Sequence, residues 1–394
     1  RLYLSAEGGA EWTYRFAEEA GAVLLRDGSE LSVGNIRIRA LHTPGHTPEH
    51  LTFLVTDGAA ADRPIGALTG DFLFVGDVGR PDLLEKAAGV RGTMEAGARD
   101  LFRSLARFRA ELPDWLQIWP GHGAGSACGK GIGSVPQSTL GYEALFNWAL
   151  AIHDEDAFVR AVLAGQPEPP RYFAEMKRIN RDGPAILGGF AVPDPLTGRD
   201  VIRLVDDGAL VVDTRPAESY AARHIPGTLN IPLNRSFTTW AGWLVPYEAD
   251  FYLLAEPGTA AEAVRDLAMI GLDRVAGVAA PEVLGSWESA GRDLERVDRV
   301  DAAAARRALA STGGAVLDVR GAAENEAVRI PDATNIPLGS LAERLHELPG
   351  ERPLYVHCES GSRSPIAASV LRSAGVAPRI AASGLFSSWV RVCT

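Results

Sequence analysis

The chain has 394 residues, which suggests two or three domains rather than one. Apolar residues make up 46% and charged residues 23%, as in ordinary globular proteins. The 50 acidic and 39 basic side chains give a net charge of −11, which argues against nucleic acid or an anionic membrane as the main partner. No apolar stretch approaches the roughly 20 residues that span a bilayer. Three cysteines cannot form a disulfide framework, so we expect a cytoplasmic protein whose thiols are available for chemistry.

The first block, residues 1–188, mixes strand signals with helical stretches. Alternating and apolar runs predict strands at 36–41, 51–55 and 116–119. A stretch rich in glycine and proline, ending near Pro195, then predicts a linker.

Three potential metal ligands, His46, Asp71 and His122, follow apolar segments of this block. Because each stands at the carboxyl end of a strand, the three could converge on one edge of a sheet. Imidazole and carboxylate groups together suit zinc or iron. Each motif alone is a weak signal, since a histidine in a loop is usually solvated or hydrogen-bonded to its neighbours. The flanking His42 and His50 are predicted to be structural or to support the ligands.

The rest of the chain contains an internal repeat. Aligning the chain with itself places Asp213 over Asp318, and the same offset superposes two Asn-Ile-Pro-Leu motifs. Each copy alternates strands, loops and helices, which implies a small α/β unit with a parallel sheet. We therefore predict two such domains, at 196–293 and 297–394.

A single thiol in the second repeat stands in a reactive setting. A buried strand is predicted at 354–357, with Cys358 at its carboxyl end and a helix starting at Ser364-Pro365. The loop between them would direct backbone N–H groups at the sulfur. Together with the helix N-terminus and Arg363, these dipoles should stabilise a thiolate and hold an anionic group on it. The predicted sulfur-binding loop comprises Glu359, Ser360, Gly361, Ser362 and Ser364.

The spacing in this loop separates two chemistries. Cysteine phosphatases resemble it, but they place more residues between cysteine and arginine, which makes room for phosphate. Four residues lie between Cys358 and Arg363, and this tighter loop resembles that of rhodanese sulfurtransferases, which carry sulfane sulfur on the cysteine. Asp318 and Arg320 match the family's Asp-x-Arg. A buried structural cysteine is the alternative, but the strand–cysteine–glycine–arginine–helix order favours function.

The first repeat has Ala255 at the position of Cys358 and Ala260 at that of Arg363. It keeps Asp213 and Arg215, which we expect to pair at the end of a strand. Without a thiol or an arginine, this copy is predicted to be an inactive rhodanese-like domain that serves as a spacer or docking surface.

The first block resembles the metallo-β-lactamase superfamily in the order and spacing of its His46, Asp71 and His122 motifs. The segments 76–82 and 120–129 make it similar to the persulfide dioxygenase branch. This resemblance implies an αββα domain, incomplete at its N-terminus, that binds one Fe(II) per chain, with zinc as the alternative. It implies that His46 and Asp71 are iron ligands.

The same resemblance places Arg80, His122 and Cys128 on the substrate side of the metal, with Arg80 a candidate for holding carboxylates. For Cys128, facing the substrate and simple packing are both open. The family's third iron ligand belongs to a His-x-His-x-Asp-His motif, which none of the 394 residues provides. We expect either that the protein continues upstream of Arg1 or that this polypeptide cannot complete an iron site.

Joined in one chain, the two resemblances predict a persulfide dioxygenase–sulfurtransferase, expected to be a homo-oligomer. Its first part would use O2 to oxidise glutathione persulfide, or a similar small persulfide, to sulfite. Cys358 would move sulfane sulfur between thiosulfate or a persulfide and an acceptor. One alternative is a zinc-dependent thioester hydrolase of the glyoxalase II kind with a rhodanese tail. Another is a sulfur carrier in which only Cys358 works and no metal site does.

Overall fold

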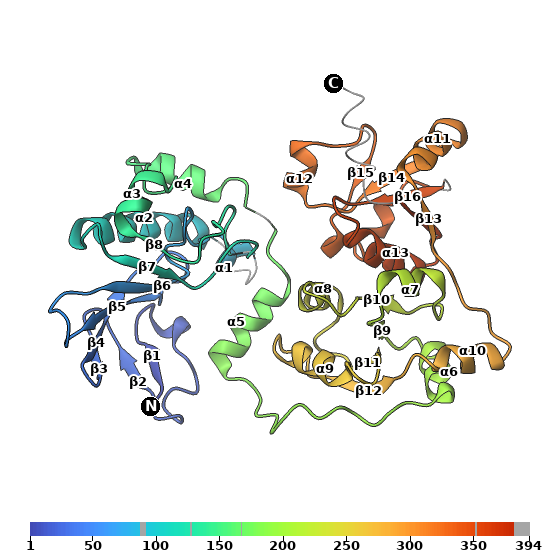
Figure 1. The fold of residues 1–394 in the computed structure, drawn as a ribbon, viewed down its shortest axis with the longest axis horizontal. Coiled ribbons are helices and arrows are strands. Elements are labelled where there is room, and N and C mark those ends of the chain that lie inside the picture. The colour runs from blue at the N-terminus through green and yellow to red at the C-terminus, as the bar shows by residue number, and fades with distance from the viewer. Residues whose placement is uncertain (87–91, 127, 167, 351–352, 382–394) are drawn as a thin grey trace. The chain divides into compact units, whose positions relative to one another are not determined.

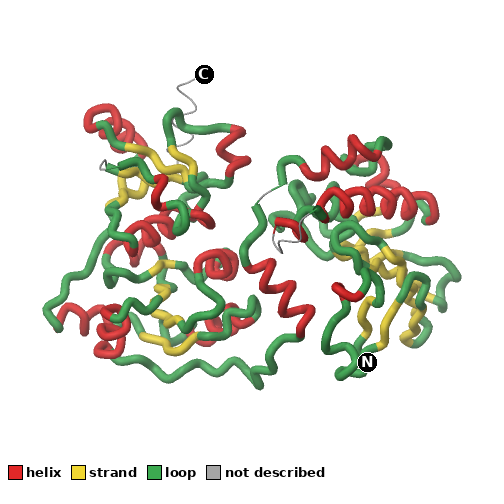
Figure 2. Tube along the Cα trace, turned by 180° about the vertical axis from the view of Figure 1, so that it is seen from behind, coloured by secondary structure: helices red, strands yellow, loops and turns green. Residues whose placement is uncertain are grey.

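The computed structural model describes residues 1–86, 92–126, 128–166, 168–350 and 353–381. The chain divides into two compact units, Arg1–Ala185 and Ile186–Thr394, and both combine helices with strands (Figure 2). The last part of the domain expected at 297–394, residues 382–394, lies outside the described residues. Among the described helices, none has the length and apolar character needed to cross a membrane.

The first unit is built on a mixed six-stranded sheet with the order β3-β4-β5-β6-β7-β8, beside a parallel pair, β1-β2. Its strands are β1 (Tyr3–Ser5), β2 (Val23–Leu25), β3 (Glu30–Val33), β4 (Ile36–His42), β5 (Leu51–Asp57), β6 (Gly66–Gly70), β7 (Gln117–Pro120) and β8 (Ser138–Thr139). Its helices are α1 (Leu83–Lys86), α2 (Thr93–Glu111), α3 (Leu140–Phe146), α4 (Glu155–Leu163), α5 (Tyr172–Asp182) and the 3₁₀ turn η1 (Ala10–Trp12). The three strands predicted from apolar runs correspond to β4, β5 and β7.

Helix α2 anchors the core of this unit. Its buried residues Leu101, Leu105 and Phe108 recur at helical spacing and form one apolar stripe. That stripe packs in a single cluster with Phe158 of α4 and with strand residues such as Leu54 of β5. Figure 1 shows α2 and α4 close to each other beside the sheet. Every second residue of β5 is buried, as expected of a strand with one face on the core.

Strand direction brings three strand ends to one edge of the sheet. Strand β5 is antiparallel to both β4 and β6, so β4 and β6 run the same way. Strand β7 is parallel to β6. The carboxyl ends of β4, β6 and β7 therefore share an edge, and the loops that follow them start there.

The second unit contains two parallel sheets, with the orders β10-β9-β11-β12 and β13-β17-β16-β14-β15. The first repeat supplies α6 (Gly198–Asp206), β9 (Val211–Asp213), α7 (Ala217–Ala222), β10 (Leu229–Asn230), α8 (Phe237–Leu244), β11 (Phe251–Leu254), α9 (Ala260–Ala268), β12 (Val275–Ala279) and α10 (Val283–Ser289). The second supplies β13 (Asp298–Val300), α11 (Ala302–Thr312), β14 (Ala315–Asp318), α12 (Ala322–Ala327), β15 (Thr334–Asn335), η2 (Leu338–Ser340), η3 (Leu345–Glu347), β16 (Leu354–His357), α13 (Arg363–Ser373) and β17 (Pro378–Ala381). The four strands of the first sheet have counterparts in the same order in the second, which confirms the predicted parallel α/β repeats.

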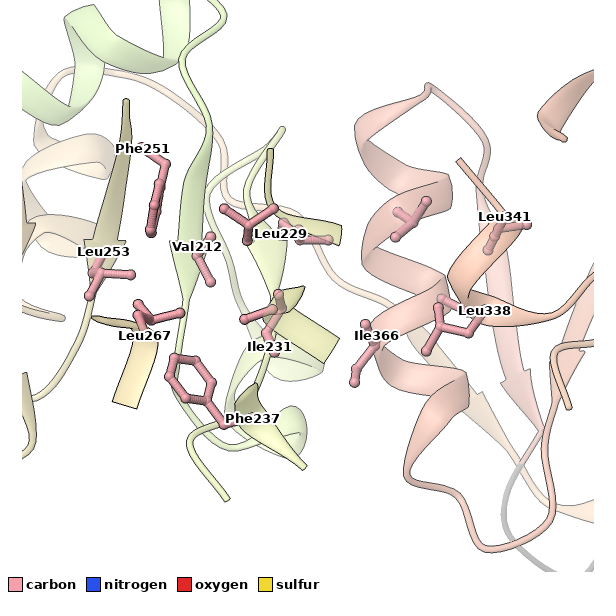
Figure 3. Close-up of a cluster of buried hydrophobic side chains, with 14 of the residues drawn as sticks. Val212, Leu229, Ile231, Phe237, Phe251, Leu253, Leu267, Leu338, Leu341 and Ile366 are labelled. Atoms are coloured by element: carbon pink, nitrogen blue, oxygen red, sulfur yellow. The ribbon is translucent and has the colours of Figure 1, made fainter. Parts of the chain in front are cut away.

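One apolar cluster joins the two repeats (Figure 3). Val212 and Phe251 of the first repeat belong to the same buried cluster as Leu338 and Ile366 of the second. A polar contact crosses as well, because the Asn230 N–H donates to the Ser369 hydroxyl at 3.0 Å. Since the repeats share a core, the domain bounds of 196–293 and 297–394 stay a prediction.

Candidate functional site

Cys358 follows β16 directly and lies beneath the N-terminus of α13. The residue is buried, at 4% exposure. Ser364, in the first turn of α13, donates to Cys358 Sγ twice: its hydroxyl at 3.0 Å and its backbone N–H at 3.4 Å. Gly361, with φ of +84°, gives the loop the left-handed turn it needs to curl back over the sulfur. The loop therefore presents donors and a helix N-terminus to a single thiol, as its sequence predicts.

The other predicted loop residues form the rim of this site. The hydroxyls of Ser360 and Ser362 lie 3.1 Å apart in a hydrogen bond. The Glu359 side chain is 55% exposed, and its carboxylate lies 3.4 Å from Nη1 of Arg320. The rim is thus polar and carries a negative charge next to the thiol.

A buried ion pair fixes the strand end beside Cys358. Arg320 Nε and Nη2 donate to the Asp318 carboxylate at 3.0 and 2.7 Å, and both side chains are almost fully buried. Burial opposes ionisation of Asp318, but hydrogen bonds from His357, Arg320 and Asn325 outweigh it and hold the pKa of that carboxyl well below its usual range. The equivalent Asp213 and Arg215 of the first repeat pair at 2.6 Å, as expected.

Arg363 behaves differently from its sequence-based expectation. Its guanidinium binds the Glu324 carboxylate through both terminal nitrogens, at 2.6 and 2.8 Å, instead of making a hydrogen bond to the sulfur. Glu324 was missed by the sequence analysis. A signal was present, because the first repeat has Ser219 at the same distance from its Asp and also lacks the arginine, with Ala260 in its place.

The shared edge of the first unit's sheet brings the three predicted metal-binding side chains together. His122 Nε2 lies 3.0 Å from Asp71 Oδ1, and His46 Nε2 lies 4.0 Å from Asp71 Oδ2. A Cβ atom at Gly79 would lie 1.7 Å from the Asp71 backbone oxygen, so only glycine fits over this residue. Each oxygen of one carboxylate therefore faces a different imidazole.

Cys128 belongs to the same cluster. Donor atoms of Asp71, His122 and Cys128 all lie within 4.8 Å of one another. Of the two possibilities left open for this thiol, the structure places it beside the candidate ligands. His122 is also closer to Asp71 than His46 is, although the sequence analysis placed it on the substrate side.

This donor set fits a bound cation. His122 Nε2 lies 3.0 Å from the buried Asp71 Oδ1, which accepts no other hydrogen bond among the described residues. The carboxylate of Asp71 and then the thiol of Cys128 raise the pKa of His122 to about 10. The negative charge of the buried Asp71 carboxylate is therefore stabilised by a positive charge beside it, which either a protonated His122 or a metal ion would provide. Imidazole, carboxylate and thiol groups suit zinc or iron.

Neighbouring groups fix the orientation of these ligands. The contact between His46 Nδ1 and the Arg80 carbonyl, at 3.1 Å, leaves Nε2 toward Asp71. His50 Nε2 accepts the Asp71 N–H at 3.2 Å, and burial lowers the pKa of His50 to about 4, so this imidazole stays neutral. His42 contacts the Pro48 carbonyl at 2.7 Å. Both flanking histidines therefore support the loops, as the sequence suggests.

Arg80 does not offer its side chain to a substrate in this structure. It is fully buried and donates to Asp82 through Nε at 3.0 Å and Nη2 at 2.8 Å. The role in holding substrate carboxylates is therefore corrected: Arg80 contributes its carbonyl to His46 and its guanidinium to a buried ion pair. The sequence could not reveal this, because burial depends on the surrounding fold.

Comparisons with known proteins agree with this architecture. The rhodanese-like domain model matches residues 197–276 and 301–391. The crystal structure of a metallo-beta-lactamase from Staphylococcus aureus subsp. aureus COL is 39% identical, covers 71% of this chain and 77% of its own, and has a TM-score of 0.62. These findings confirm the predicted metallo-β-lactamase fold followed by rhodanese-like α/β domains.

Two curated relatives are named as metal-dependent hydrolases. A probable metallo-hydrolase of Burkholderia pseudomallei is 41% identical over 102 residues, 25% of this chain and 31% of the relative. The probable polyketide biosynthesis zinc-dependent hydrolase BaeB of Bacillus velezensis is 26% identical over 121 residues, 31% of this chain and 46% of the relative. The chain thus spans less than half the length of either relative.

Proposed function

The chain belongs to the metallo-β-lactamase family and carries two rhodanese-like domains, and from this premise we propose that it is a persulfide dioxygenase–sulfurtransferase. The observation that carries the proposal is the position of Cys358 Sγ, 3.0 Å from the Ser364 hydroxyl and 3.4 Å from its N–H. A thiol held at a helix N-terminus by two donors is suited to nucleophilic attack and to carrying an anionic sulfur. The same chain holds a candidate metal centre, which would add an oxidative step to the sulfur transfer.

Sulfur transfer would proceed by exchange at Cys358. The thiolate attacks the outer sulfur of a donor, a new S–S bond forms, and the donor's own S–S bond breaks. The electron pair leaves with sulfite when the donor is thiosulfate, or with glutathione thiolate when it is glutathione persulfide. An acceptor thiolate or sulfite then takes the outer sulfur, and Cys358 is released as thiolate. The two donors of Ser364 stabilise the negative sulfur in both steps.

In the first unit, His46 and Asp71 would hold a metal ion, with His122 and Cys128 beside it. A bound Fe(II) would supply the redox chemistry that reaction with O2 requires. The contact of His46 with the Arg80 carbonyl keeps Nε2 free as a ligand atom. The overall oxidation consumes one persulfide, one O2 and one water, and it yields one thiol, one sulfite and two protons.

The sulfurtransferase half is tested by Cys358→Ser in the full chain. Because the hydroxyl is a far poorer nucleophile than the thiolate, transfer from thiosulfate or glutathione persulfide to cyanide should fall to the uncatalysed rate. Donor-treated wild-type protein should gain one sulfur atom on Cys358 by mass spectrometry. Ala255→Ser, the matched change in the first repeat, should leave both readouts unchanged. Full activity in Cys358→Ser would refute the assignment.

The oxidative half is tested by metal content and O2 uptake. Protein loaded with Fe(II) should consume O2 only when a persulfide is added, and Asp71→Ala should lose both the metal and the uptake. Asp250→Ala, which removes an exposed carboxylate paired with Arg274, is the control and should retain both. Bound metal without persulfide-dependent O2 uptake would exclude the dioxygenase.

A zinc-dependent thioester hydrolase is the second candidate. It is favoured by the donor groups around Asp71, whose two oxygens face His46 and His122 separately, because these side chains would hold zinc and the bound zinc would supply Lewis-acid chemistry. In that case the zinc-loaded protein should hydrolyse a glutathione thioester, and Fe(II) loading should give no O2 uptake.

A further inference from the structure

Both terminal nitrogens of the Arg363 guanidinium bind a single carboxylate. Nη1 donates to Glu324 Oε2 at 2.6 Å and Nη2 to Oε1 at 2.8 Å. Parallel bonds of this kind are strong and geometrically specific. The Arg363 side chain is 18% exposed and that of Glu324 43%, so water screens the pair only in part. The charge beside Cys358 is therefore largely neutralised.

Glu324 is also fixed from its other side. Its Oε2 accepts the N–H of Gly321, the residue that caps α12, at 2.9 Å. The carboxylate is thus held at a helix N-terminus independently of Arg363, where the helix dipole favours a negative charge. Glu324 consequently positions the guanidinium, rather than following it.

The remaining charges near the thiol are also paired. Arg320 binds Asp318 and reaches Glu359. Asp318 and Arg320 are buried, so the charges that reach the rim are those of Glu359, Glu324 and Arg363, two negative and one positive. A small dianion such as thiosulfate would approach a rim that is negative overall. A thiol-bound persulfide presents a single negative charge at the transferable sulfur, and its other charges lie elsewhere in the molecule.

The first repeat shows what happens when the pair is absent. There Ala255, Ala260 and Ser219 replace the cysteine, the arginine and the glutamate together. The repeat nevertheless forms its sheet in the same strand order. The Glu324–Arg363 pair is therefore not required for the fold and accompanies the reactive thiol.

We propose that Glu324 is a positioning residue that neutralises Arg363 and thereby makes Cys358 select thiol-bound persulfides over thiosulfate as sulfur donors. This inference rests on the proposed sulfurtransferase function. Ser364, not Arg363, then provides the hydrogen-bond donors to Cys358 Sγ. These donors have a single negative charge to balance when the sulfur donor is a persulfide.

The test compares donors with the full chain. Sulfur transfer to cyanide is measured with thiosulfate and with glutathione persulfide, after subtraction of the uncatalysed rate. In Glu324→Gln the amide oxygen can still accept from Gly321, but the negative charge is gone. The ratio of kcat/KM for thiosulfate to that for the persulfide should rise about tenfold, mainly through a lower KM for thiosulfate. The KM for thiosulfate should also become more sensitive to ionic strength.

Two variants serve as controls. Glu324→Asp keeps the charge and should keep the wild-type ratio. Glu218→Gln makes the same change in the first repeat, where the carboxylate pairs with Arg299 at 3.0 Å, and should also keep that ratio. An unchanged or lower ratio in Glu324→Gln, or an equal rise in Glu218→Gln, would overturn the proposal. If Cys358→Ser retains transfer, the sulfurtransferase function itself fails, which is a distinguishable result.

Discussion

The two rhodanese-like repeats of the second unit agree in fold and differ at the reaction centre. Both carry a buried Asp–Arg pair, at 2.6 Å in the first and 2.7 Å in the second. Only the second has the thiol with its two donors from Ser364, and the first has alanine at the corresponding position, Ala255. The comparison teaches that a repeat can lose its chemistry at little cost to the fold, because the reactive groups lie on one loop. The ion pair is kept because either partner left alone would be a buried, uncompensated charge.

The largest effect should come from breaking the ion pair that both repeats share. Asp213→Asn and Asp318→Asn should each lower the free energy of unfolding by about 3–5 kcal/mol, because a buried guanidinium loses its counter-charge. Urea denaturation of the full chain measures this. Asp250→Asn breaks an exposed pair with Arg274 and should cost less than about 1 kcal/mol. If the buried and the exposed pairs lost the same free energy of unfolding, burial would not be what makes the Asp–Arg pair important.

Removing the Ser364 hydroxyl should lower the sulfur-transfer activity, whereas the matched change in the first repeat should not affect it. Ser364→Ala should reduce kcat/KM for sulfur transfer roughly 10- to 100-fold, since a hydrogen bond to a charged group is lost. Ala261 stands at the equivalent position of the first repeat, and Ala261→Ser should leave the activity unchanged. Steady-state kinetics with glutathione persulfide as donor provides the measurement. A wild-type rate in Ser364→Ala would show that the backbone N–H is sufficient.

A smaller effect concerns how the free energy of unfolding depends on pH through His224 of the first repeat. Burial lowers the pKa of His224, which stacks on Tyr220 with 3.9 Å between ring centroids. Below the unfolded-state pKa of about 6.5, the unfolded chain binds a proton that the native imidazole does not, so stability falls as pH falls, by at most about 1.4 kcal/mol per pH unit. His224→Gln should have a shallower loss of stability between pH 7 and pH 5. The urea midpoints of the wild type and of His224→Gln are measured across this pH range. An equal decrease in the two proteins would contradict the prediction.

The smallest effect is expected when a cysteine is introduced into the first repeat at position 255. Ala255→Cys should not acquire a stable extra sulfur atom when treated with persulfide, because Ala260 and Ala261 supply neither the arginine nor the hydroxyl. Intact-mass measurement in a Cys358→Ser background checks this. A persulfide on the introduced thiol as abundant as that on wild-type Cys358 would show that the loop donors are dispensable.

Local sequence patterns predicted a large part of this structure. Apolar runs located β4, β5 and β7, and a cysteine between a strand and a helix indicated the thiol site. These features depend on neighbours within a few residues, so the sequence carries them directly. The partner of Arg363 was missed because Glu324 lies 39 residues away in sequence. The buried state of Arg80 was missed for a different reason: its counter-charge, Asp82, is only two residues away, but the burial of both side chains depends on the surrounding fold.

From its sequence alone, this chain could be understood as a potential metal site followed by two related α/β repeats, one with a nucleophilic thiol and one without. Residue identity and spacing determine those properties, because they fix which groups exist and which strands precede them. Tertiary structure decided how the groups are used. It brought Cys128 to Asp71 and His122, turned Arg80 inward to Asp82, and bound Arg363 to Glu324. The pairings of Cys128 and of Arg363 join separate elements, so packing rather than order along the chain sets their distances. The Arg80–Asp82 pair is local in sequence, but only the surrounding fold buries it.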